Sequence, residues 1–72
     1  MAKNHQTENP LYRALVKQYE SEIASAVATL IVYFDNPTGA QLIKEMDEQV
    51  LIISMAEQNL ASLNKHFNNT QI

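Results

Sequence analysis

The chain has 72 residues, no cysteine, five lysines plus arginines and eight aspartates plus glutamates, for a formal net charge of −3. So short a chain forms one domain with a marginal core, and the absence of cysteine excludes disulfides and thiolate zinc sites. The acidic balance argues against a general nucleic-acid binder. Since disulfides and thiolate zinc sites are excluded, self-association remains as the means of stabilising the fold.

The chain begins with a polar segment, residues 1–8, that has no apolar run. This composition predicts a frayed end and no secretory signal. Asn9 and Pro10 follow as an N-cap and a first helical residue, because an N-cap side chain accepts a backbone hydrogen bond and a proline at the first position loses no helical bond. We therefore expect a first helix from about Pro10 to Phe34.

A break at residues 35–39 separates this helix from a second one. The second helix has two alternative starts, which remain open: Pro37 after an Asn36 cap, or a capping box with Thr38 at the cap and Gln41 three residues later. It is expected to run from about residue 38 to Phe67 and to be followed by a polar, frayed end at residues 68–72. The longest mostly apolar stretch, residues 23–34, is shorter than a membrane span. We expect a soluble, cytoplasmic protein that does not contact a membrane.

Apolar residues recur at alternating steps of four and three in both helices, which is typical of coiled-coil seams. Folding the chain back at the break pairs the seams in layers, from Tyr12 with Leu60 to Leu30 with Leu42. The sequence therefore predicts an all-α fold, an antiparallel two-helix hairpin. Gln49, the polar seam residue, is either a pin of the register or, as we favour, a side chain that reaches solvent at the edge. The seam residues are Tyr12, Val16, Tyr19, Ile23, Ala26, Leu30 and Tyr33, then Leu42, Met46, Gln49, Ile53, Ala56, Leu60, Leu63 and Phe67.

A lone hairpin would leave many apolar side chains in water, most of them toward the turn. A helix that is apolar on all sides is normally buried on all sides. We therefore expect the protein to be a homo-oligomer, in which two hairpins form a four-helix bundle or a higher assembly. Docking onto a different protein is the alternative, and the two can coexist. The residues expected at the self-association interface are Val27, Ile31, Phe34, Ile43, Val50 and Ile52.

Side chains that could carry catalysis or bind a metal ion form no recognisable pattern. The carboxylates fall outside the seams, no Glu-x-x-His is present, and no glycine-rich phosphate loop occurs. We expect no enzymatic activity, no catalytic residues, no metal and no cofactor. A possible anion site for RNA or a nucleotide is the basic open end of the hairpin, with Arg13, Lys17 and Lys65. Ordinary solvation of charged side chains is the simpler interpretation.

Four segments carry a resemblance: Asn9-Pro10-Leu11-Tyr12-Arg13-Ala14-Leu15, Tyr19-Glu20-Ser21-Glu22-Ile23, Val32-Tyr33-Phe34-Asp35-Asn36-Pro37 and Glu45-Met46-Asp47. Together they resemble small uncharacterised helical-hairpin proteins of tailed bacteriophages, especially marine ones, over about residues 8–67. The resemblance implies a phage accessory protein, in the host cytoplasm or in the virion, whose partner is a virion or host protein. Its motifs are caps and core positions, so it assigns a function to no residue.

Overall fold

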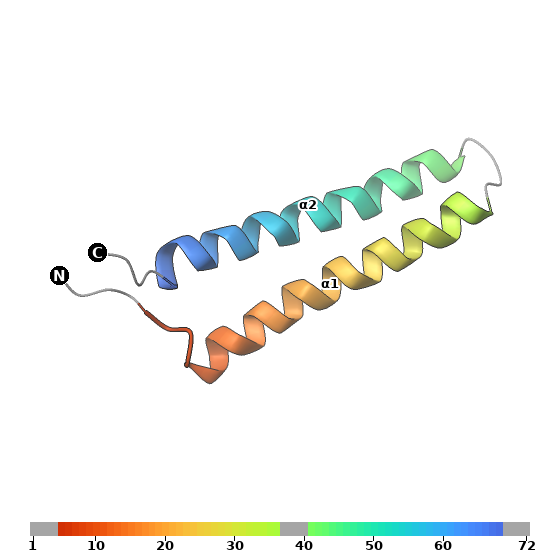
Figure 1. Cartoon of the computed structure of the whole chain (residues 1–72). Helices are drawn as coiled ribbons and strands as arrows, with labels where there is room; N and C mark the ends of the chain where they lie inside the picture. The colour runs from red at the N-terminus through yellow and green to blue at the C-terminus, as the bar shows by residue number, and fades with distance from the viewer. Residues whose placement is uncertain (1–4, 37–40, 69–72) are drawn as a thin grey trace.

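The computed structural model describes residues 5–36 and 41–68, which form two helices, α1 (Pro10–Asp35) and α2 (Gln41–Phe67). The helices lie antiparallel and side by side, and the molecule is a rod of 55 × 18 × 14 Å (Figure 1). The predicted all-α antiparallel hairpin is therefore confirmed. Both predicted starts of the second helix, at Pro37 and at Gly39 after a Thr38 cap, lie outside the described residues, as does most of the predicted end after Phe67.

Helix α1 begins at the N-cap that the sequence predicts. Asn9 has an extended backbone, with φ −71° and ψ 126°, and its side-chain oxygen accepts a hydrogen bond of 2.8 Å from the backbone N–H of Leu11. Pro10 takes the first helical position, where its missing N–H leaves no bond unmade. At the other end, the backbone N–H of Asn36 donates to the carbonyl oxygens of Val32 and Tyr33. Both ends thus satisfy backbone groups that a helix leaves unpaired.

The segment that precedes α1 is hydrogen-bonded to the end of α2 at the open end of the hairpin. The backbone N–H of Gln6 donates to the carbonyl oxygen of Phe67 over 2.8 Å, and that of Asn9 donates to the carbonyl oxygen of Gln6 over 2.8 Å. The ring of Tyr12 packs edge-on against that of Phe67, with centroids 6.5 Å apart. The expected fraying of residues 1–8 therefore does not extend to Gln6, because the last carbonyls of α2 need donors and Gln6 supplies one.

The predicted seams are confirmed by burial. Every seam residue is buried or half-buried, including Gln49. Only Ala26 and Ala56 are fully buried among the described residues, each with 1% of its surface exposed. No side-chain nitrogen or oxygen in the described ranges is both buried and unpaired, which agrees with a Gln49 side chain that reaches solvent. Two small residues make a minimal core, so the hairpin itself buries little apolar surface.

The predicted layers between the two helices need correction. They pair Tyr12 with Leu60, whereas the Tyr12 ring contacts the ring of Phe67, two helical turns further along α2. They also place the start of α2 beside Ile31, whereas α2 begins level with the end of α1 (Figure 1). Each residue of α1 therefore lies opposite a residue of α2 that is later in the chain than the layers predict. The physical reason is that a heptad pattern repeats every seven residues and leaves the axial register to the length of the turn.

Candidate interaction surfaces

Large apolar side chains cover much of the surface of the hairpin. Within the described ranges, all of the exposed ones except Leu11 and Leu15 lie between Val27 and Met55, from the middle of the rod to the turn. Large apolar side chains that gather on one side of a monomeric protein usually mark a binding surface, so their distribution around the hairpin matters. In the described part of the chain, the exposed large apolar residues are Leu11, Leu15, Val27, Ile31, Val32, Phe34, Ile43, Val50, Leu51, Ile52 and Met55.

One group of these residues forms a surface that we call the Val27 face. Val27, Ile31 and Phe34 follow one another at steps of four and three, so they share one side of α1. Ile43 and Val50 are seven residues apart and share one side of α2. Their exposed fractions range from 40% for Val27 to 66% for Phe34 and Ile43. The Val27 face comprises Val27, Ile31, Phe34, Ile43 and Val50.

The opposite surface, which we call the Ile52 face, contains a groove between the helices. The groove has a volume of 330 Å³, and Glu22 of α1 lines it together with Ile52, Met55 and Asn59 of α2. These four residues define the face, and Ala56 lies between them at the seam. Because Glu22 lies on the side of α1 away from Val27, its contact with this groove assigns the two sides of the hairpin.

The predicted interface must therefore be divided. Five of its residues form the Val27 face, but the structure places Ile52 on the other side, in the groove with Glu22. The reason is helical geometry: Ile52 is two positions after Val50, which corresponds to a rotation of about 200° around α2. Their spacing along α2 is by itself enough to assign Val50 and Ile52 to different sides of the helix. Only the packing of the helices brings Glu22 to the same groove. Glu22, Met55 and Asn59 are therefore not among the site residues that the sequence predicts.

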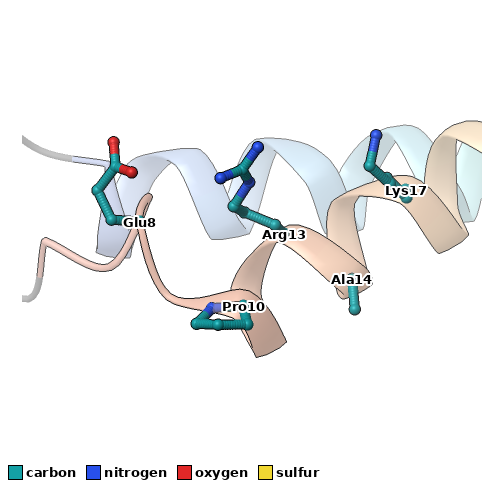
Figure 2. A pocket seen from close by; sticks show the side chains of 5 residues that line it. All are labelled: Glu8, Pro10, Arg13, Ala14 and Lys17. Atoms are coloured by element: carbon teal, nitrogen blue, oxygen red, sulfur yellow. The ribbon is translucent and has the colours of Figure 1, made fainter.

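Two of the three predicted anion-binding residues lie together at the open end. Arg13 and Lys17 line two adjoining hollows of 380 and 230 Å³. Figure 2 shows their charged groups on the same side of α1 as the carboxylate of Glu8, which lines the first hollow. Glu20 lines the second hollow. Lys65 is in the last turn of α2 and lines neither. The structure thus separates Lys65 from the pair and gives the pair carboxylate neighbours.

Carboxylates extend the Ile52 face toward the turn. Glu45 and Glu48 lie seven residues before Ile52 and Met55, so each pair shares a side of α2. Burial raises the pKa of the Tyr33 hydroxyl above its ordinary value, and the nearby carboxylates of Glu45 and Glu48 raise it further. Glu45 and Glu48 thus add two carboxylates to the turn-proximal part of the Ile52 face.

The described residues form neither a metal site nor a membrane span. No group of three or more histidine, aspartate or glutamate side chains in the described part of the chain lies close enough to hold a metal ion. Neither helix, over its described residues, has the length and apolarity needed to cross a membrane. Comparisons with protein-family models, curated proteins and solved structures gave no match. The two faces of the hairpin are therefore the features that bear on its function.

Proposed function

We propose that this protein is a non-enzymatic interaction protein whose hairpins self-associate through the Val27 face. The exposure of five large apolar side chains on one side of so thin a rod carries the proposal. The assembled hairpins then act through protein–protein contacts. The resemblance to hairpin proteins of tailed phages supports an accessory or virion-associated role, with a virion or host protein as the partner.

The exposed area supports self-association. The whole chain of 72 residues, and not the two helices alone, exposes 5534 Å². A folded monomer of its mass, 8.2 kDa, is expected to expose about 4500 Å². Pairing of two hairpins through the Val27 face would remove part of this surplus, and a stable interface buries ~800 Å² on each partner.

The gain in free energy would come mainly from the largest side chains. Phe34 and Ile43 are each 66% exposed, and Ile31 is 53% exposed. Moving each of them out of water contributes about 1–2 kcal/mol per protomer. Ala26 and Ala56 alone are fully buried among the described residues of the hairpin, so assembly is expected to add to the stability of its fold.

The solution mass tests this proposal. Light scattering after size exclusion, over a range of loading concentrations, is expected to give a species of at least twice the chain mass of 8.2 kDa. The mass should fall toward that of the single chain only on strong dilution, because association depends on concentration. A mass of one chain at the highest concentrations would overturn the proposal.

An anion-binding module for RNA or a nucleotide is the second candidate, since Arg13 and Lys17 share both hollows at the open end. Binding of a labelled RNA oligonucleotide should then weaken steeply as salt rises. It should be lost when Arg13 and Lys17 are both replaced by glutamate. Lys44→Glu is the control, because Lys44 belongs to the other end of the hairpin. The absence of saturable binding at low salt would eliminate this candidate.

A further inference from the structure

The Ile52 face remains open in a dimer that pairs the Val27 faces. The groove of Glu22, Ile52, Met55 and Asn59 lies on the other side of the seam from Val27. A hairpin bound to a second copy through the Val27 face therefore presents this groove to solvent. The Ile52 face has its own geometry, so its binding properties do not depend on the self-association proposed above.

The groove is suited to apolar side chains of a partner. Ile52 is 39% exposed and Met55 is 55% exposed, while Ala56 between them is buried and so small that the groove reaches the seam. Its 330 Å³ can take one or two aliphatic side chains. Methionine adapts its shape to what it contacts, which favours binding through Met55. Because the groove runs between two helices that lie side by side, an amphipathic helix laid along it has the matching shape.

Charge determines which amphipathic helix fits. Glu22 lines the groove, and Glu45 and Glu48 continue the same side toward the turn. None of the lysines and arginines in the described ranges lies on this side: Arg13 and Lys17 line the hollows at the open end. Lys44 and Lys65 are 21 residues apart on the outer side of α2. The face is therefore apolar at its centre, with carboxylates beside the groove and toward the turn.

We propose that the Ile52 face binds a cationic amphipathic helix of another protein. Aliphatic side chains of the partner enter the groove against Ile52 and Met55, and its lysines or arginines lie beside Glu22, Glu45 and Glu48. A second copy of this chain is a poorer match, because its basic pair, Arg13 and Lys17, shares its hollows with Glu8 and Glu20.

The test uses a fluorescently labelled helical peptide of leucine and lysine, with a peptide of leucine and glutamate in the same pattern as the control. Fluorescence anisotropy at low salt should show saturable binding of the first peptide and none of the second. Glu22→Lys should weaken binding by about fivefold, the size expected for one exposed charge pair. Met55→Ser should weaken it by about tenfold through the loss of a buried apolar side chain.

Glu20→Lys is the matched control for Glu22→Lys. It changes the net charge equally and lies only two residues away on α1, but Glu20 is seven residues from Val27 and belongs to the other side. The affinity of Glu20→Lys should therefore stay within about twofold of the wild type. Equal weakening by both substitutions, or no effect of Met55→Ser, would mean nonspecific charge attraction and would overturn the proposal.

A third variant separates this proposal from self-association. Ile31→Asp alters only the Val27 face, so the peptide should bind it as it binds the wild type, whatever its oligomeric mass. Loss of peptide binding in Ile31→Asp, with retention in Glu22→Lys, would place the peptide on the Val27 face and refute the assignment. Circular dichroism of each variant confirms that the helices are intact.

Discussion

Ile31→Asp and Val50→Asp are each expected to convert the self-associated protein into single hairpins of 8.2 kDa. Both side chains are exposed in the hairpin, at 53% and 51%, so the substitutions leave the seam intact and helicity should persist. In the assembly the same carboxylate would be buried without a partner, which costs about 3 kcal/mol or more per site. Light scattering measures the mass, and circular dichroism measures the helicity.

Leu11→Asp is the control for these variants. Leu11 is 77% exposed and lies at the open end, away from the Val27 face, so the same substitution there should leave the mass unchanged. Met55→Asp, on the Ile52 face, should also preserve it. If Ile31→Asp and Val50→Asp keep the wild-type mass, the Val27 face is not the self-association interface. Dissociation by Met55→Asp alone would assign the interface to the opposite side.

Ala26→Leu and Ala56→Leu are expected to lower the free energy of unfolding by about 1–3 kcal/mol each. Each alanine is 1% exposed at the seam, where the helices leave no room for a larger side chain. In a chain of this size each kcal/mol corresponds to about 4–8 °C in the unfolding midpoint. Thermal unfolding followed by circular dichroism measures the shift, with all proteins at one concentration because association raises the midpoint.

Ala28→Leu gives the matched comparison on the same helix. Ala28 is exposed, so the added side chain extends into solvent and should change stability by no more than about 0.5 kcal/mol. Equal midpoints for the Ala26 and Ala28 variants would show that the two helices can move apart at no cost. The close approach of α1 and α2 at Ala26 and Ala56 would then not be a determinant of stability.

The seams and the first helix cap follow from the sequence alone. Alternating steps of four and three place Tyr12 to Tyr33 on one side of α1, since 3.6 residues per turn leaves no other arrangement for them. Asn9 and Pro10 similarly identify the start of α1, because capping is a local interaction of a few residues. The division between Val50 and Ile52 was also readable from their spacing.

Tertiary structure decided the register of α2 and the composition of each face. The heptad pattern accepts Leu60 or Phe67 opposite Tyr12 equally well, and the contact with Phe67 depends on where the turn releases the second helix. The grouping of Glu22 with Ile52 depends on which sides of the two helices meet across the seam. Such relations join residues distant in the chain, and periodicity within one helix carries no information about its position relative to the other.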